Sequence, residues 1–283
     1  MTGATNRTVK DFKSDLRPVW CPGCGDYGVL NPFLQALVAT GKDPMNTVIV
    51  SGIGCSGRFP YFCSTYGFHG VHGRSVPTAL GVKAAAPNLD VFCVGGDGDG
   101  LGIGGGHLPH AARKNVDMTY LLINNNIYGL TKGQSSPTSP ISMVSKTAPY
   151  TNIEDPLNPA EMLLAYNTSF VGVGYSGKPK MLKTLFTEAI EHKGFSVVLV
   201  HSPCVTFNKE VTGEVMSGLF AELPDEFDPG DKAAAYRYAM DADRMWTGVL
   251  HRQQRPTLQD RVEAQRERSG SYENLEELMN RYI

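Results

Sequence analysis

The feature that most constrains the fold is a stretch in which two apolar runs each end in glycine or polar residues. The run at 90–95 (DVFCVG) leads into an acidic glycine-rich turn, GDGD at 96–99, and the run at 118–123 (MTYLLI) leads into three asparagines. Short continuous apolar runs are typical of buried parallel strands, and the residues between them, 101–114, have helical character. The stretch therefore predicts a strand–helix–strand unit with polar groups at the carboxyl end of both strands.

The same alternation extends over most of the chain. Further runs that we expect to form strands cover 47–51, 168–173 and 196–201. Stretches that we expect to form helices cover 26–40, 75–86, 159–167 and 178–193. This alternation predicts an α/β fold with a parallel sheet and helices on both of its faces. Ligands in such folds bind beyond the carboxyl ends of the strands, where the glycine-rich turns 52–57 and 95–106 are expected.

The length of the chain allows one large α/β domain with an added tail, or two small domains. The chain has 283 residues, of which 41% are hydrophobic and 19% charged, and its net charge is −2. This balanced charge does not indicate general nucleic-acid binding. We expect an amino-terminal segment at 1–24 that carries a CxxC pair, an α/β domain at 25–210 and a helical extension at 211–283, with helices over 231–253 and 257–282. The extension is interpreted either as a solvated appendage or as an arm that packs on another subunit.

Neither a secretory signal nor a membrane span is predicted. The amino-terminal residues are polar and lack the apolar core of a signal peptide. No apolar run reaches the roughly 18–20 residues needed to cross a bilayer. We therefore expect a cytoplasmic protein, in which metal binding explains the six cysteines better than disulfides do. Two of the six, Cys63 and Cys93, we interpret as structural.

The residues after the two central strands are suited to hold a diphosphate through Mg2+. Asp97 offers a carboxylate, Asn125 an amide oxygen and Ile127 a main-chain carbonyl, which are hard oxygen ligands of the kind that Mg2+ prefers. The clustered glycines let backbone N–H groups face phosphate oxygens, and a helix from about residue 101 would add its positive end. A ligand-free acidic turn or a nicotinamide site would explain GDGD alone, but neither explains its pairing with the asparagines.

Four cysteines are placed where they could share one metal centre. Cys21 and Cys24 form a CxxC at the start of the first predicted helix. Cys55 follows the first predicted strand and Cys204 the last, so both are expected at the carboxyl edge of the sheet. Two alternatives remain: a zinc site with four thiolates, and a redox-active cysteine pair, which would normally follow a strand.

Taken together, these motifs resemble one family of thiamine-diphosphate enzymes. GDG followed later by NN resembles the motif shared by transketolases, decarboxylases and 2-oxoacid oxidoreductases. The whole set resembles the beta subunit of the 2-oxoacid:ferredoxin oxidoreductases over about 20–210. The matching segments are WCPGCG (20–25), SGIGCSGR (51–58), FHGVHGR (68–74), GGDGDGLGIGGGH (95–107), RKN (113–115), NNNIYGLTKGQSSPTS (124–139) and HSPC (201–204).

The resemblance implies thiamine diphosphate, Mg2+ and one 4Fe–4S cluster as cofactors, with CoA as a co-substrate. The implied Mg2+ ligands are Asp97, Asn125 and the Ile127 carbonyl. The implied cluster ligands are Cys21, Cys24, Cys55 and Cys204. The residues implied to contact the cofactors are Gly54, Cys55, Gly96, Asp97, Gly98, Asp99, Asn125, Ile127, Gly129 and Leu130.

The implied reaction is the oxidative decarboxylation of a 2-oxoacid with CoA, which gives an acyl-CoA, CO2 and reduced ferredoxin and can run in the CO2-fixing direction. The chain has no room for a second α/β domain, which would carry the Glu that activates thiamine. An alpha subunit is therefore expected to supply it, in an α2β2 heterotetramer that also meets ferredoxin. A non-redox thiamine decarboxylase subunit would leave the four cysteines idle, and a non-enzymatic zinc protein would leave GDGD and the asparagines unexplained.

Four basic side chains are candidates for substrate binding or proton transfer. Lys132, in GLTKGQ, is expected to pair with the distal carboxylate of 2-oxoglutarate and so to favour it over pyruvate, although a solvated loop lysine or a broader specificity stays open. Arg58 could bind a substrate carboxylate or a CoA phosphate. His69 and His72 could line the pocket or relay protons, or only hydrogen-bond within their loop.

Overall fold

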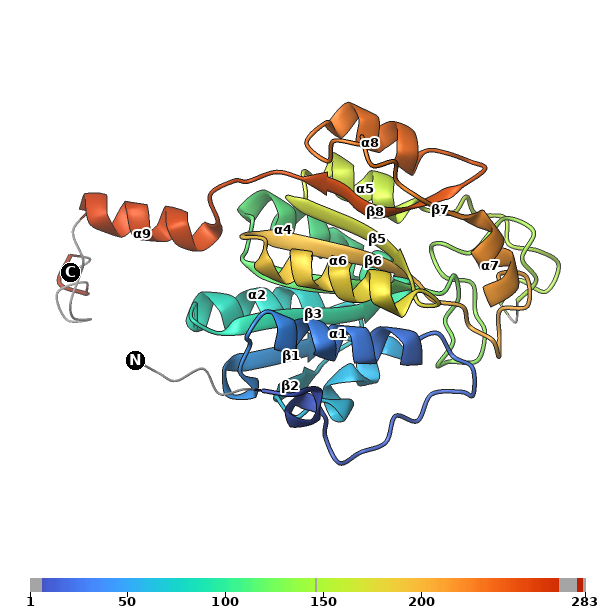
Figure 1. The fold of residues 1–283 in the computed structure, drawn as a ribbon, viewed down its shortest axis with the longest axis horizontal. Helices are drawn as coiled ribbons and strands as arrows, with labels where there is room; N and C mark the ends of the chain where they lie inside the picture. Colours follow the sequence, from blue (N-terminus) through green and yellow to red (C-terminus); the bar gives the residue numbers. More distant parts are fainter. Residues whose placement is uncertain (1–6, 146, 270–278, 282–283) are drawn as a thin grey trace.

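The computed structural model describes residues 7–145, 147–269 and 279–281, and its centre is an eight-stranded sheet (Figure 1). The strands are β1 (Thr47–Ser51), β2 (Tyr66–His69), β3 (Asp90–Gly96), β4 (Met118–Asn124), β5 (Phe170–Tyr175), β6 (Phe195–His201), β7 (Phe220–Glu222) and β8 (Met245–Arg252). Their order across the sheet is β2-β1-β3-β4-β6-β5-β8-β7. The first six are parallel, whereas β8 pairs with β5 in the antiparallel direction.

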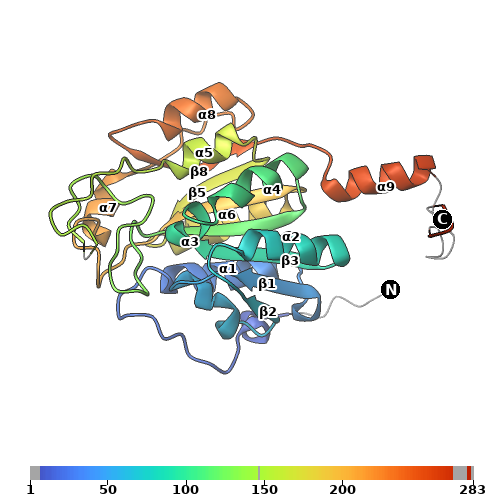
Figure 2. The ribbon, with the colours of Figure 1, turned by 180° about the vertical axis from the view of Figure 1, so that it is seen from behind.

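Helices cover both faces of the sheet, as predicted. The helices are α1 (Tyr27–Ala39), α2 (Ser75–Ala85), α3 (Asp97–Leu101), α4 (Leu108–Lys114), α5 (Pro159–Ala165), α6 (Pro179–Glu191), α7 (Gly213–Leu219), α8 (Lys232–Ala239) and α9 (Leu258–Ser269). α1 and α6 lie over the face seen in Figure 1, and α2 and α4 over the face seen in Figure 2. Val94 and Leu121 pack under the first pair, while their neighbours Cys93 and Tyr120 point to the opposite core.

The predicted parallel strands are confirmed, with small shifts at their ends. β1 covers the predicted 47–51, and β5 begins at residue 170 instead of 168. β4 and β6 are buried along their whole length. Burial on both faces explains why these runs are continuously apolar and carry many β-branched residues.

Two helix predictions were wrong. The stretch 101–114 is not one helix: a short helix, α3, begins at Asp97 itself, and α4 begins only at Leu108. The glycines between them, which lower helix propensity, separate the two. Of the helix predicted over 231–253, only α8 is confirmed. Residues 245–252 instead form the strand β8, which pairs with the neighbouring strand β5. Long-range pairing has here overridden local propensity.

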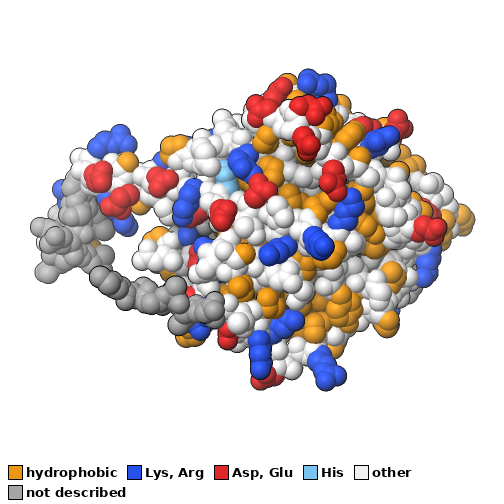
Figure 3. Space-filling view, viewed as in Figure 1, with side chains coloured by type: hydrophobic (Ala, Val, Ile, Leu, Met, Phe, Trp, Pro, Cys, Tyr) orange, Lys and Arg blue, Asp and Glu red, His pale blue; other side chains and the backbone are white. Residues whose placement is uncertain are grey.

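The carboxyl-terminal region contains a polar helix, α9, that extends away from the rest of the protein. α9 has no buried residue and projects away from the sheet (Figure 1). It carries acidic and basic side chains along its length, and both signs are also mixed over the face of the body seen in Figure 3. The helix predicted over 257–282 is confirmed for 258–269, and residues 270–278 lie outside the described residues. The domain boundaries predicted at 24/25 and 210/211 stay predictions.

Several chain segments meet at the carboxyl edge of the sheet. β1, β3, β4 and β6 all end there, and each is followed by residues that the sequence singles out for chemistry. The long segment 125–158, whose described residues form neither helix nor strand, lies over this edge (Figure 1). Across the described residues, every helix is too short or too polar to span a bilayer.

Candidate active site

The Asp97 carboxylate lines an oxygen-rich pocket between β3 and β4. It is 1% exposed, and both of its oxygens accept hydrogen bonds. Oδ1 accepts from the Asn125 backbone N–H (3.3 Å), and Oδ2 accepts from the hydroxyls of Ser136 and Thr138 (2.8 Å for Thr138). Burial raises the pKa of Asp97, and these three donors oppose that rise because they stabilise the charged form.

The residues just after β4 add neutral oxygens to this pocket. The Asn125 side-chain oxygen accepts from the Ile127 backbone N–H (3.1 Å), which forms a tight turn that fixes the amide. Ile127 itself is buried. All ten residues implied to contact the cofactors line one cavity of about 60 Å³ between these segments. The structure thus brings together the complete predicted set, and carboxylate, amide and carbonyl oxygens are suited to a hard cation.

Asp99 lines the same pocket and also binds the backbone of two neighbouring loops. Its Oδ1 accepts from the backbone N–H groups of Ile53 (2.9 Å) and Gly73 (2.7 Å). His72 Nδ1 lies 3.3 Å from the same oxygen. A Cβ on Gly52 would lie 2.1 Å from the Asp99 oxygens, so only glycine fits there. Asp99 therefore holds two glycine-rich loops in place around the pocket.

The two candidate histidines are separated by the structure. His72 lines the oxygen pocket, where its ring lies 5.9 Å from that of Tyr128. His69 lines neither cavity of the site: its Nδ1 lies 3.0 Å from the Ser51 hydroxyl and its ring packs on Tyr61. For His69 the geometry favours hydrogen bonding within the loop over a place in the pocket.

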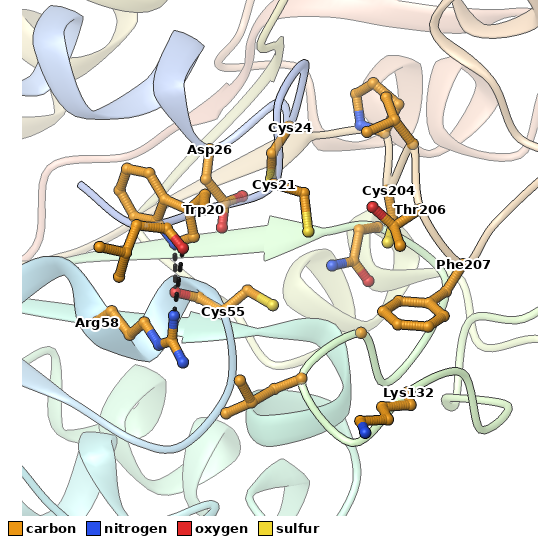
Figure 4. Close-up of a pocket in the computed structure, with 16 residues that line it drawn as sticks. Trp20, Cys21, Cys24, Asp26, Cys55, Arg58, Lys132, Cys204, Thr206 and Phe207 are labelled. Carbon is orange, nitrogen blue, oxygen red and sulfur yellow. Dashed lines mark hydrogen bonds between the residues drawn. The ribbon is translucent and has the colours of Figure 1, made fainter.

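A second cavity, of about 240 Å³, adjoins the first and contains the four candidate cysteines (Figure 4). Cys21 and Cys24 reach it from the loop before α1, Cys55 from the turn after β1, and Cys204 from the loop after β6. Its other walls are mainly apolar, and they include the side chains of Val19, Leu130 and Phe207. Trp20 secures one wall, because its indole N–H donates to the Cys55 carbonyl (2.7 Å).

Burial opposes the ionisation of two of the thiols in this cavity. Burial raises the pKa of Cys55 to about 12, and the charges of Asp26 and Cys204 add to the rise. Burial also raises the pKa of Cys24, with Asp26 again adding to it. In the described part of the chain, no three His, Cys, Asp or Glu side chains are arranged closely enough to bind a metal ion as they stand. The four thiols share a cavity without forming a finished metal site.

The two cavities share one wall. Cys55, Asn125, Gly129 and Leu130 line both of them. A Cβ built on Gly129 would lie 3.5 Å from the sulfur atoms of both Cys55 and Cys204, and 4.0 Å from the Asn125 amide nitrogen. Gly129 therefore lies next to both thiols at this shared wall, and Cys55 itself faces the oxygen pocket.

The two candidate cations lie at the rim of the thiol cavity. Arg58 and Lys132 both line it, and Figure 4 shows them below the sulfur atoms. The Arg58 guanidinium donates to the Val19 carbonyl at 3.5 Å, a weak contact. Lys132 is exposed, and its backbone has a φ of 79°, a conformation that side chains other than glycine rarely adopt.

Comparisons with known proteins agree with this geometry. Residues 52–200 match the family "Thiamine pyrophosphate enzyme, C-terminal TPP binding domain", and residues 204–267 match the C-terminal family of the pyruvate ferredoxin oxidoreductase beta subunit. Subunit beta of 2-oxoacid:ferredoxin oxidoreductase 2 from Aeropyrum pernix is 38% identical over 91% of this chain and 87% of its own length. This chain belongs to the beta subunits of the 2-oxoacid:ferredoxin oxidoreductases.

Two further relatives bear on the type of beta subunit. The 2-oxoglutarate oxidoreductase subunit KorB from Mycobacterium tuberculosis is 46% identical over 70% of this chain and 53% of its own length. A solved chain of the 2-oxoglutarate:ferredoxin oxidoreductase from Magnetococcus marinus, with 2-oxoglutarate, coenzyme A and succinyl-CoA bound, is 43% identical. It superposes with a TM-score of 0.94 over 96% of this beta subunit and 94% of that chain.

Some residues of the beta subunit's site were missed by sequence reasoning. Ser136 and Thr138 orient Asp97 from a loop that has no periodicity, so only the matched segment GQSSPTS drew attention to it. Asp26, two residues after Cys24, is 1% exposed and lines the thiol cavity. Its Oδ1 accepts from Ser202 (3.1 Å), whereas its Oδ2 has no partner among the described residues. Burial raises the pKa of Asp26 to about 6.

Proposed function

We propose that this beta subunit, together with an alpha subunit, catalyses the CoA-dependent oxidative decarboxylation of 2-oxoglutarate. The carboxylate next to the ketone leaves as CO2, the remaining acyl group joins the CoA sulfur, and one proton and two electrons are released. The electrons pass one at a time to ferredoxin. The products are succinyl-CoA, CO2 and reduced ferredoxin, and the reaction can also run in the CO2-fixing direction. A cytoplasmic location is part of the proposal.

The observation that carries the proposal is the wall shared by the two cavities. A thiamine enzyme that releases its electrons singly needs an electron acceptor close to the cofactor. Here Cys55 lines both the thiol cavity and the pocket that contains Asp97 and Asn125, and Gly129, in the same wall, lies next to the Cys55 and Cys204 thiols. A non-redox thiamine decarboxylase would not need this arrangement of thiols.

The residues of the oxygen pocket fit Mg2+ and a diphosphate. Asp97, Asn125 and the Ile127 carbonyl would hold the cation, since they supply one charged and two neutral oxygens at one edge of the sheet. Gly54 has a φ of 138° and no atom within 4 Å of an added Cβ, which leaves its backbone open to a ligand. Thiamine diphosphate, when bound, supplies the electron sink for the loss of CO2.

The residues of the thiol cavity fit a 4Fe–4S cluster. Cys21, Cys24, Cys55 and Cys204 would hold it, and its iron would stabilise the thiolates, which burial disfavours at Cys24 and Cys55. The apolar walls would exclude water from the cluster. A zinc ion with the same four ligands would fit the sulfur chemistry but could not accept electrons.

Lys132 supports 2-oxoglutarate as the substrate. It lies at the rim of the thiol cavity, and it holds a backbone conformation that costs about 1 kcal/mol for a residue other than glycine. Strain of this kind is typical of functional positions. An ammonium group there would pair with the second carboxylate of 2-oxoglutarate, which pyruvate lacks. Arg58 would contribute charge at the rim of the same cavity, and His72 would contribute hydrogen bonds from the oxygen pocket.

The proposal is tested by purifying the co-expressed alpha and beta subunits without oxygen. We expect a brown complex with broad visible absorbance that bleaches on reduction, and ferredoxin reduction that depends on both CoA and 2-oxoglutarate. Pyruvate should give a much lower kcat/KM. A colourless zinc-containing complex would exclude the redox function. Equal turnover of both oxoacids would leave the redox function intact but overturn the assignment of 2-oxoglutarate.

A further inference from the structure

Both ends of the loop that carries Lys132 are hydrogen-bonded to the carboxylate of Asp97. Asn125, at its start, donates its backbone N–H to Asp97 Oδ1 (3.3 Å). Ser136 and Thr138, at its end, donate their hydroxyls to Asp97 Oδ2 (2.8 Å for Thr138). The two oxygens of Asp97 thus hold opposite ends of the segment 125–138.

The two ends are also joined to each other. The Ser139 hydroxyl donates to the Asn126 carbonyl (2.7 Å), and the Asn126 amide donates to the Thr138 carbonyl (2.7 Å). Thr138 Oγ1 lies 2.8 Å from Asn124 Oδ1 as well as from Asp97 Oδ2, but it has one hydrogen to share. The carboxylate is the stronger acceptor, because hydrogen bonds to charged groups are about twice as strong as neutral ones.

Between its ends the loop is short and internally bonded. The Tyr128 backbone N–H donates to the Gln134 carbonyl, and the Gly133 N–H donates to the Tyr128 carbonyl (both 2.9 Å). The Lys132 N–H donates to the Gly129 carbonyl (3.0 Å). These hydrogen bonds make residues 128–134 a compact turn. If the two ends of the loop move, we expect Lys132 to move with them, because little flexible backbone lies between.

We propose that Ser136 and Thr138 are positioning residues that link the Asp97 carboxylate to the placement of Lys132, and so couple cofactor binding to the choice of oxoacid. The inference rests on the proposed function. A carboxylate already oriented by two hydroxyls loses less freedom when a cation binds it. Reciprocally, a cation that fixes Asp97 stabilises both ends of the loop, because such coupling acts equally in both directions.

Thr138→Val tests the link in the alpha–beta complex, because it removes the hydroxyl and keeps the shape of the side chain. We expect amide hydrogen exchange of residues 128–133 to become about ten-fold faster in the absence of cofactor. Mg2+-dependent binding of thiamine diphosphate, followed by fluorescence quenching, should weaken about 10- to 100-fold. KM for 2-oxoglutarate should rise more than KM for pyruvate. Thr138→Ser keeps the hydroxyl and should restore all three measurements toward those of the unmodified complex.

Substitutions of two neighbouring serines provide a second test variant and its matched control. Ser136→Ala removes the other hydroxyl from Asp97 and should act in the same direction as Thr138→Val. Ser135→Ala makes the same change one residue away, where the hydroxyl contacts Ser145, and should have little effect on any of the three measurements. A melting temperature for each variant separates local loosening from a general loss of fold.

Separate outcomes judge the coupling and the proposed function. The coupling is overturned if Thr138→Val weakens thiamine binding but leaves both the exchange of 128–133 and the ratio of KM values unchanged, since the hydroxyls then orient only the ligand. If the unmodified complex turns over no 2-oxoacid, the proposed function fails. In that case the exchange rates of Thr138→Val and Ser135→Ala still decide whether Asp97 holds the loop.

Discussion

The two cavities at the carboxyl edge of the sheet differ in how far the protein alone completes them. In the oxygen pocket, each oxygen of Asp97 already accepts a hydrogen bond, and Asn125 is held in a tight turn. In the thiol cavity, Cys24 and Cys55 are half-buried among mainly apolar walls, and burial raises the pKa of both.

The difference follows from the chemistry of the two ligand types. A buried carboxylate must be hydrogen-bonded to remain charged, so the fold has to supply donors whether or not a cation is present. A thiol can remain neutral and behaves as a small apolar side chain until a metal stabilises its thiolate. The side chains of the oxygen pocket are therefore oriented without a ligand, whereas the proposed cluster would have to complete the thiol cavity.

The largest effect should come from removing one thiol. Cys24→Ala should abolish the visible absorbance and the reduction of ferredoxin, because a cluster that loses one of four ligands is not held. Thiamine binding should change by no more than about two-fold, since the oxygen pocket does not use this side chain. Iron content and thiamine fluorescence quenching measure the two effects on the same preparation.

Cys63→Ala is the matched control for this change. Cys63 is a buried cysteine outside both cavities, so the variant should keep its colour and its ferredoxin reduction. Loss of thiamine binding in Cys24→Ala would show that the two cavities depend on each other for assembly, against the comparison made above.

Removing the charge of Asp97 should give the converse result. Asp97→Asn keeps one acceptor oxygen for the hydroxyls of Ser136 and Thr138, but its NH2 group cannot accept from the Asn125 N–H, and the cation loses its charged ligand. We expect Mg2+-dependent thiamine affinity to fall at least about 10- to 100-fold. The iron content should remain unchanged. A colourless Asp97→Asn complex would contradict the independence of the two cavities.

A smaller effect, on the choice of substrate, is expected from Lys132 at the rim of the thiol cavity. Lys132→Gly should raise KM for 2-oxoglutarate about ten-fold relative to pyruvate, because a hydrogen-bonded charge pair is lost from a site that is still partly exposed. The backbone conformation there favours glycine, so stability should not fall. Lys132→Met removes the charge but keeps the strain, and it should match the glycine variant in KM ratio. An unchanged ratio in both variants would rule out carboxylate pairing.

The parts of this site that were predictable from the sequence depend on local pattern. Continuous apolar runs located β3 and β4, and the residues that follow them placed Asp97 and Asn125 at one edge. The cysteines were assigned together because each follows or precedes a predicted element. The arrangement of the four described thiols, which share a cavity without a finished metal geometry, is a property of packing that spacing does not report.

The parts that were not predictable depend on contacts between distant segments. Thr138 reaches Asp97 across 41 positions of the chain, and Asp99 anchors the backbone of Ile53 and Gly73. β8 was expected to be helical from its composition, and the strand was missed because its partner, β5, lies far back in the sequence. Such contacts decide the role of a side chain after the fold has formed, so residue type alone could not assign them.

The smallest effect on cofactor binding should come from a substitution of Gly129, in the wall that the two cavities share. Gly129→Ala would place a methyl group 3.5 Å from the sulfur atoms of Cys55 and Cys204, an ordinary contact in the protein without cofactors. Once both cavities are filled, the same methyl group takes space from each, at a cost of about 1 kcal/mol, or roughly five-fold in affinity. Unlike the changes at Cys24 and Asp97, this one substitution should lower both the iron content and the thiamine affinity. An effect on only one of them would show that Gly129 belongs to a single cavity and that the wall is not shared.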